Sequence, residues 1–259
     1  ATNRKGDWPD MRVFAFDHRM QFEAMEGATP KKIGAFKELC LSAALQVADG
    51  KPGHGILCDR RLGRDALYKA VGQGLWIGRP AELPGTRPLE LEAELGADCG
   101  GLGEWPLDHV VKVLCFCHPD DDAALWADQE ATVKRLFTAA RRNRLEFLLE
   151  VIPSKAGPVD DDTTATVIQR FYDLGVSPDW WKLEPFKTDA AWQNACDAIT
   201  RNDTNTRGIV VLGLDAPADE LFASFAMAQP GSAVELASIA FPFSSPFAML
   251  ARAAQDAAL

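Results

Sequence analysis

A lysine and a glutamate two residues apart, inside one apolar segment, are the first residues in this sequence to suggest chemistry. In DWWKLEPF, residues 179–186, Lys182 and Glu184 stand where the pattern predicts a buried strand. Side chains at i and i+2 of a strand share a face, so both point one way and Trp181 and Leu183 point the other. An unprotonated lysine amine attacks carbonyl carbons and forms a Schiff base, whereas a lysine paired with a carboxylate can be a purely structural salt bridge. Both interpretations stay open from spacing alone.

A nucleophilic lysine must lose its proton. The pKa of a lysine side chain in water is about 10.4, so lowering it to near 7 takes roughly three units, or about 4 kcal/mol. Burial and a second cation close by both favour the neutral amine. Lys112 in VVKVLCF belongs to another apolar strand and can supply that cation, and Glu150 near the end of FLLEVI can supply a carboxylate. We therefore expect Lys182, Lys112 and Glu150 to meet in one interior.

The elements that would position these residues follow from eight short apolar runs, typical of parallel strands covered on both faces. We predict strands at 12–16, 55–59, 75–78, 110–116, 147–152, 180–185, 208–213 and 234–241. Helical patterns occur at 30–48, 121–143, 163–175, 188–201, 218–228 and 246–257. This alternation predicts one α/β domain over residues 1–259, a (β/α)8 TIM barrel with residues 1–10 as a loose tail. Residues 79–108, rich in Gly, Pro and Glu, predict an irregular excursion in the third unit.

Active sites of such barrels lie at the carboxyl ends of the strands, where this sequence places many charges. Asp17, His18 and Arg19 follow the first strand, Asp59 and Arg60 the second, and Arg79 the third. In an acidic protein, arginines gathered at one end can attract an anionic substrate. They can equally form a solvated rim, and both interpretations stay open.

Two histidines raise the alternative of a metal site. His18 and His118 both follow predicted strands, near Asp17 and Glu150, and such a set can bind zinc or manganese. However, the chain has only 4 histidines, and none shows the i, i+3 or i, i+4 spacing of a strong ligand motif. Alternation also separates Cys115 and Cys117 from His118. We expect no metal and no cofactor.

The bulk composition limits partners and location. A net charge of −10 argues against nucleic acid and anionic membrane surfaces as general partners. We find no apolar run long enough to span a bilayer and no signal-peptide pattern at the N-terminus. The 6 cysteines lack the spacing of a disulfide framework. We expect a cytoplasmic protein acting on a small anionic sugar or sugar acid, as a monomer or a homo-oligomer.

Seven segments together carry a resemblance to a known family: FAFDHR, GILCD, LWIGRPAELPG, VVKVLCFCHPDD, FLLEVIP, WWKLEPF and GIVVLGLDAP. They resemble the aldolase-like domain that in many bacteria is fused behind the sugar kinase of inositol catabolism, 5-dehydro-2-deoxygluconokinase. That domain is similar to class I tagatose bisphosphate aldolase, a (β/α)8 enzyme. The resemblance runs over residues 12–225.

The resemblance implies catalytic roles for four residues. Lys182 matches the Schiff-base lysine, and Glu150 matches the general acid and base. Lys112 matches a second lysine that holds or polarises substrate, and Asp17 matches a carboxylate facing the reacting centre. His18 stands where the aldolases have glutamine. The implied reaction is a metal-independent class I aldol cleavage of a keto-deoxy sugar acid phosphate, 5-dehydro-2-deoxyphosphogluconate.

One segment departs from the family pattern. After the eighth strand the related domains carry a Gly-Arg pair for phosphate, whereas this chain reads IAFPFSSPF. Ser244 and Ser245 can still offer a hydroxyl and amide groups to an anion. Our expected substrate-binding set is His18, Arg19, Asp59, Arg60, Arg79, Glu184, Asp215, Ser244 and Ser245. Two alternatives of other classes stay open: a non-catalytic sugar-phosphate-binding barrel, acting as a sensor or partner domain, and a metal-dependent lyase or isomerase.

Overall fold

The computed structural model describes residue 8, residues 11–213 and residues 236–241 of the chain. Three predicted site residues, Asp215, Ser244 and Ser245, lie outside the described residues. So do the helices predicted at 218–228 and 246–257 and most of the predicted tail.

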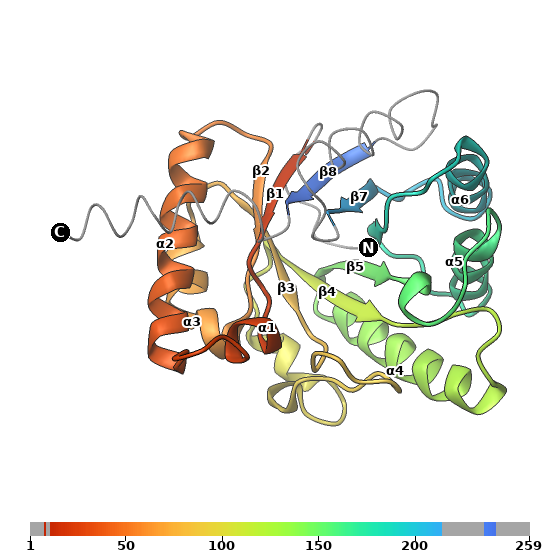
Figure 1. The fold of residues 1–259 in the computed structure, drawn as a ribbon, viewed down its shortest axis with the longest axis horizontal. Coiled ribbons are helices and arrows are strands. Elements are labelled where there is room, and N and C mark those ends of the chain that lie inside the picture. The colour runs from red at the N-terminus through yellow and green to blue at the C-terminus, as the bar shows by residue number, and fades with distance from the viewer. Residues whose placement is uncertain (1–7, 9–10, 214–235, 242–259) are drawn as a thin grey trace.

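Parallel strands form a strongly curled sheet at the centre of the molecule (Figure 1). Each strand pairs in parallel with the next along the chain, and the last strand also pairs with the first. All the predicted strand segments are confirmed to within two residues at either end. They are β1 (Met11–Ala15), β2 (His54–Leu57), β3 (Trp76–Pro80), β4 (His109–Cys115), β5 (Glu146–Val151), β6 (Trp180–Leu183), β7 (Gly208–Leu212) and β8 (Leu236–Phe241).

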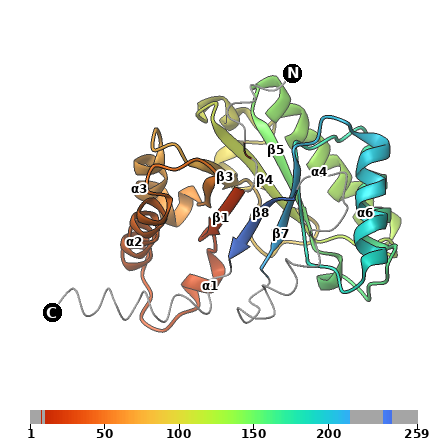
Figure 2. The ribbon, with the colours of Figure 1, turned by 90° about the horizontal axis from the view of Figure 1, so that it is seen from above.

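Helices cover the outer face of this sheet (Figure 2). They are α1 (Met20–Glu23), α2 (Pro30–Ala48), α3 (Arg60–Ala70), α4 (Ala123–Arg142), α5 (Thr163–Asp173) and α6 (Asp189–Asn202). The prediction had no bounds for α1 or α3; α1 is only 4 residues long, and α3 is interrupted by the non-helical Gly63. Among the described residues, none of the helices combines the length and the apolar character that a membrane span requires.

The third unit departs from the strand-and-helix alternation, as the sequence predicted. Between β3 and β4 the described chain forms two 3-10 helices, η1 (Ala93–Leu95) and η2 (Gly100–Glu104), in place of an α-helix. A third, η3 (Pro153–Lys155), follows β5. The fold is therefore a parallel α/β sheet of TIM-barrel-like form, with an irregular third unit.

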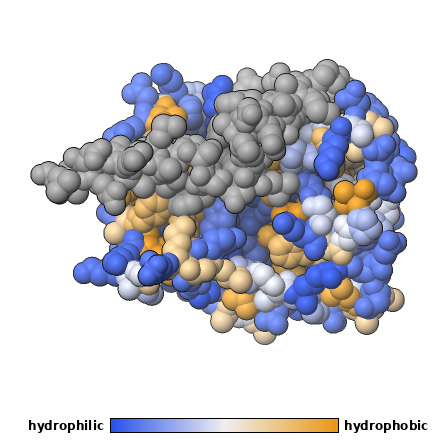
Figure 3. Space-filling model, viewed as in Figure 1, coloured by the Kyte–Doolittle hydropathy of each residue, from blue (hydrophilic) through white to orange (hydrophobic). Residues whose placement is uncertain are grey.

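Alternation along the strands divides the apolar residues between two cores. In β4, Val111, Val113 and Cys115 pack outward with the helices, whereas Val110 packs inward. Cys115 and Cys117 thus lie under the helices. The inner core is closed by Trp76 and Trp180, whose ring centroids are 5.8 Å apart. The face shown in Figure 3 is mostly hydrophilic, with smaller hydrophobic patches, as expected once the apolar residues are withdrawn into these cores.

Side-chain caps mark the starts of two helices. Asp59 lies two residues after β2, and its Oδ2 accepts a hydrogen bond of 2.7 Å from the amide of Leu62 at the start of α3. Thr29 caps α2 in the same way, with Pro30 at the first helical position. These caps satisfy amide groups that a helix leaves unpaired, and the cap at Asp59 sets the start of α3 close to the end of β2.

We predict that Asp179→Ala destabilises the fold by about 3 kcal/mol, because it leaves buried donors unsatisfied. Asp179 is fully buried before β6, and its Oδ2 accepts hydrogen bonds from the amide of Phe147, at 2.8 Å, and from Arg141. Urea unfolding measures the change. The exposed Asp65→Ala on α3 is the matched control and should stay within about 0.5 kcal/mol of wild type. A cost below about 1 kcal/mol for Asp179→Ala would contradict this account.

Candidate active site

Three charged side chains from neighbouring strands meet in the interior of the sheet. Lys182 of β6 is directly opposite Glu150 of β5 in the strand register, and Lys182 Nζ lies 2.9 Å from Glu150 Oε1. Lys112 Nζ of β4 lies 2.8 Å from Glu150 Oε2. All three side chains are buried, with 5%, 2% and 4% of their surface exposed for Lys182, Glu150 and Lys112. The structure thus brings together the three residues that the sequence predicted to meet.

The ammonium group of Lys112 has further carboxylate neighbours. Its Nζ lies 2.9 Å from Glu82 Oε1 and 3.5 Å from Asp17 Oδ2, in addition to Glu150. Burial favours the neutral amine, but the three carboxylates together outweigh burial and raise the pKa of Lys112 above its ordinary value. Lys112 is therefore a fixed cation at neutral pH.

Two of the carboxylates around Lys112, those of Asp17 and Glu150, are held in their ionised form. Burial alone would raise the pKa of Asp17, but the ammonium groups of Lys112 and Lys182 lower it below the ordinary range. The same balance, burial against the two lysines, lowers the pKa of Glu150. Burial lowers the pKa of His18, so its imidazole is neutral.

The two carboxylate oxygens of Glu150 contact different lysines. Oε1 lies 2.9 Å from Lys182 Nζ, and Oε2 lies 2.8 Å from Lys112 Nζ. A buried carboxylate beside a lysine amine can accept a proton or a hydrogen bond from a hydroxyl group next to that amine. The pair Lys182 and Glu150 thus combines a potential nucleophile with a potential base.

Glu184 does not join this group. Strand β6 ends at Leu183, and Glu184 lies beyond it, where its carboxylate accepts hydrogen bonds from the amide, at 3.1 Å, and the hydroxyl of Ser154. Within the described residues, the hydrogen-bond partner of Glu184 is therefore Ser154.

The arginines at the ends of the first three strands each contact a glutamate. These contacts occupy the guanidinium groups, although Arg60 and Arg79 share one carboxylate, that of Glu94, so the described residues do not present the arginines as free anion-binding groups. The pairs are Arg19 with Glu82 and Glu92, Arg60 with Glu94, Arg61 with Glu23, and Arg79 with Glu94.

Arg79 is the clearest correction to the predicted substrate-binding set. It faces outward, because Trp76 of the same strand faces the interior and residues three apart in a strand lie on opposite faces. Its guanidinium stacks on Trp105 at 3.9 Å from the ring centroid and lies 2.8 Å from Glu94. Asp59 likewise has structural partners, since it caps α3 and pairs with the fully buried Lys37.

Two important charged residues were missed from the sequence. Lys37 lies on the buried face of α2 with Ile33 and Cys40, and a lysine in an apolar stripe was the available signal. Its Nζ also donates to the carbonyl oxygen of His18 at 2.8 Å, which ties α2 to the end of β1. Glu82 lies within the segment LWIGRPAELPG, in the excursion after β3, where no periodicity marked it as buried.

The predicted alternative of a metal site finds no support among the described residues. His118 is engaged in its own loop: Nε2 lies 2.7 Å from the carbonyl oxygen of Pro158, and Nδ1 accepts from the amide of Asp120 at 3.2 Å. Over the described ranges, no group of three or more His, Cys, Asp or Glu side chains is arranged to hold a metal ion.

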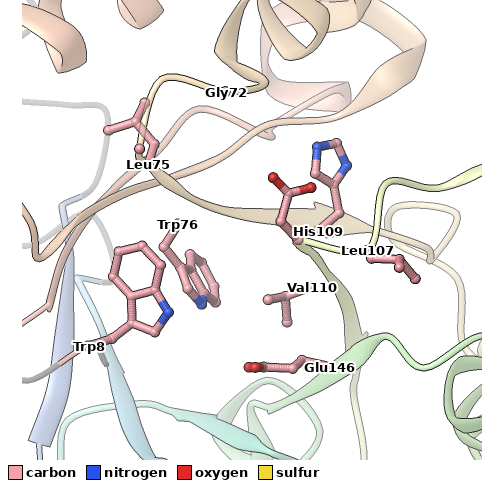
Figure 4. A pocket seen from close by; sticks show the side chains of 10 residues that line it. Trp8, Gly72, Leu75, Trp76, Leu107, His109, Val110 and Glu146 are labelled. Carbon is pink, nitrogen blue, oxygen red and sulfur yellow. The ribbon is translucent and has the colours of Figure 1, made fainter. Parts of the chain in front are cut away.

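A separate cavity of about 190 Å³ opens at the amino ends of the strands (Figure 4). Trp8, Trp76, Val110 and Glu146 line it, together with loop residues before β3 and β4. These strand residues precede Lys112 and Glu150 by two and four positions, so the cavity lies below the charged group, at the end of the sheet away from Lys182. We do not assign the chemistry to it.

Comparisons with known proteins agree with this fold. A family model described as "Uncharacterized protein conserved in bacteria (DUF2090)" matches residues 1–238. No curated protein matches the chain in sequence. Among solved structures, the chain is similar to a fructose-bisphosphate aldolase from Plasmodium falciparum, at 12% identity with a TM-score of 0.64, covering 95% of this chain and 83% of the aldolase.

Two further solved structures are similar. One is a fructose-bisphosphate aldolase from Slackia heliotrinireducens, at 13% identity with a TM-score of 0.57, covering 88% of this chain and 73% of that one. The other is a Corynebacterium glutamicum protein, at 16% identity with a TM-score of 0.57, covering 90% and 77%. At these identities the likeness shows a shared fold, and the chemistry must be argued from the residues themselves.

We predict that Lys112→Met costs about 3–5 kcal/mol of unfolding free energy at pH 7, because it leaves buried carboxylates without their cation. In wild type, the lowered pKa values of Asp17 and Glu150 mean that both stabilise the fold above about pH 4 and cease to do so as pH falls further. Without Lys112, burial raises the pKa values of Asp17 and Glu150. These carboxylates then become protonated as pH falls towards 5, which reduces the destabilisation of the variant.

Urea unfolding at pH 7 and pH 5 therefore tests whether Lys112 holds these carboxylates. The difference between Lys112→Met and wild type should shrink at the lower pH, whereas the exposed Lys69→Met should stay near wild type at both. A difference that is the same at both pH values would show that Lys112 does not hold the carboxylates in their ionised form.

Proposed function

The chain belongs to the family described as uncharacterized proteins conserved in bacteria (DUF2090), and we propose that this member is a class I, metal-independent aldolase on a (β/α)8 barrel. One observation carries the proposal: a buried lysine, Lys182, lies 2.9 Å from the carboxylate of Glu150, beside the fixed cation Lys112. Glu150 and Lys182 lie in the carboxyl halves of their strands, where barrels of this type carry their active sites, and Lys112 lies at the middle of β4. The shared fold with fructose-bisphosphate aldolases supports the proposal.

The first step is transfer of the Lys182 proton. Glu150 Oε1 is the adjacent acceptor, and the transfer changes an ion pair into a neutral amine and a neutral carboxylic acid without changing the net charge of the pair. Lys112 opposes the transfer, because it stabilises ionised Glu150. The substrate captures the neutral amine once it forms.

Schiff-base formation then uses both partners. The lone pair of Lys182 Nζ forms a bond to the ketone carbon, and the π electrons of the carbonyl move to its oxygen. That oxygen takes one proton from the attacking nitrogen and a second from Glu150 and leaves as water, so an iminium ion remains. Glu150 is again a carboxylate at this stage.

Carbon–carbon cleavage follows from the iminium. Glu150 takes the proton from the hydroxyl on the carbon beyond the scissile bond, that hydroxyl becomes an aldehyde, and the bonding electrons move into the iminium to give an enamine. Protonation of the enamine and hydrolysis release a ketone and restore Lys182. Lys112 holds substrate oxygens next to this centre, and Asp17 faces it from β1.

For the substrate we propose the keto-deoxy sugar acid phosphate of inositol breakdown, 5-dehydro-2-deoxyphosphogluconate, which would give a three-carbon ketone phosphate and a semialdehyde. The sequence resemblance supports this assignment. Because Arg19, Arg60 and Arg79 contact glutamates, we assign phosphate binding to Ser244 and Ser245, with His18 and Asp215 as further substrate contacts.

We predict that borohydride reduction in the presence of a ketone traps a covalent adduct on Lys182, because only an iminium is reduced to a stable amine. The test uses dihydroxyacetone phosphate, dihydroxyacetone and pyruvate, followed by peptide mass spectrometry. Lys182→Met should give no adduct. Lys155→Met, an exposed lysine after β5, should label as wild type does.

Two results would contradict the proposal. Ketone binding without any adduct would favour the alternative of a non-catalytic sugar-phosphate-binding barrel. An adduct that persists in Lys182→Met would place the nucleophile elsewhere.

A further inference from the structure

The irregular excursion after β3 delivers a carboxylate to the interior of the sheet. The chain doubles back there, with an antiparallel bridge between Glu82 and Leu91 and a hydrogen bond of 2.9 Å from the amide of Glu92 to the carbonyl of Ala81. The amide of Ala81 in turn donates to the carbonyl of Lys112 at 2.8 Å, which attaches the excursion to β4. Glu82 is thereby fixed beside Lys112.

Both oxygens of the Glu82 carboxylate are occupied. Oε1 accepts from Lys112 Nζ at 2.9 Å and from Arg19 Nη2 at 2.8 Å, and Oε2 accepts from the amide of Leu114 at 3.1 Å. Arg19 also donates to the Glu82 carbonyl at 2.7 Å. Glu82 is only 3% exposed. Its contacts are therefore with Lys112, Arg19 and the backbone, so any influence on a reaction must pass through Lys112 and the local charge.

We infer that Glu82 is a positioning residue of this site: it holds Lys112 against Glu150 and balances the charge that surrounds Lys182. The inference rests on the aldolase function proposed above. When Lys182 is protonated, three cations and three carboxylates surround this centre, and Glu92 adds a fourth carboxylate that contacts Arg19. The cations are Arg19, Lys112 and Lys182, and the carboxylates are Asp17, Glu82 and Glu150.

The neighbourhood of Lys182 must be taken as a whole, because every charge in it affects the proton on its amine. Burial favours the neutral amine, whereas a neighbouring carboxylate favours the protonated amine. The titratable groups on the described elements around this centre are Asp17, His18 and Arg19 after β1, Lys37 of α2, Asp59 after β2, Glu82 and Glu92 after β3, Lys112 of β4, Glu150 of β5 and Glu184 after β6. Removal of the Glu82 charge makes the surroundings of Lys182 more positive, which favours loss of the Lys182 proton.

The test measures how readily Lys182 loses its proton without using any ketone. Trace acetic anhydride labels neutral amines, and mass spectrometry of the Lys182 peptide against pH gives the midpoint of labelling. Glu82→Gln should lower this midpoint by about one pH unit. Glu92→Gln is the matched control, since Glu92 contacts Arg19 but not Lys112 and is 17% exposed, and its midpoint should match wild type.

A second variant covers the case in which Glu82→Gln does not fold. Arg19→Gln removes a cation from the same group, so the midpoint should rise instead of falling. A folded Glu82→Gln or Arg19→Gln with the wild-type midpoint overturns the inference.

The outcome is distinct from that of the ketone experiment. An adduct on Lys182 with an unmoved midpoint refutes the role of Glu82 alone. A shifted midpoint with no ketone adduct refutes the aldolase proposal and leaves the charge-balancing role of Glu82 supported.

Discussion

The ammonium group of Lys112, surrounded by three carboxylates, is the interaction on which the rest of the site depends. Charges in a dry interior are tolerated only when they are paired and hydrogen-bonded. Lys112 supplies one cation to Asp17, Glu82 and Glu150, and Arg19 and Lys182 supply the other two. Loss of any one member leaves an uncompensated charge, so the group behaves as a unit.

The fold accommodates this charged group because polar and apolar side chains form separate layers in the interior of the sheet. Residues at alternate positions of β5 and β6 point inward, and Trp180 lies two residues before Lys182 as Leu148 lies two before Glu150. The tryptophan layer excludes water from below, which strengthens every charge interaction above it. The same layer separates the charged group from the cavity at the opposite end of the sheet.

Much of this arrangement followed from the sequence because strand alternation is a local property. Apolar runs predicted the strand positions. Because alternate side chains of a strand share a face, the sequence also predicted that Lys112, Lys182 and Glu150 lie in one interior. Arg79 was predicted to bind substrate because it lies near a strand end. Alternation along β3 places its side chain on the outer face, so this prediction was wrong. Glu184 was predicted to share the strand face of Lys182. However, β6 ends at Leu183, so Glu184 lies beyond the strand, just before Pro185.

Pairing partners were harder to predict because they are distant along the chain. Glu82 meets Arg19 across 63 positions and Lys112 across 30, and no local pattern encodes either contact. The excursion that carries Glu82 has neither helical nor strand periodicity, so its residues gave no signal of burial. Lys37 did give one, since a lysine on the apolar stripe of α2 requires a buried partner, but the identity of that partner, Asp59, depends on the packing of α2 against the end of β2.

The most direct measurement is a crystal structure of the protein after borohydride reduction with dihydroxyacetone phosphate. Our account predicts continuous electron density from Lys182 Nζ into the ligand, with a ligand oxygen within hydrogen-bond distance of Glu150 and Lys112. Density for an unattached ligand, or attachment to a lysine outside the interior of the sheet, would contradict it.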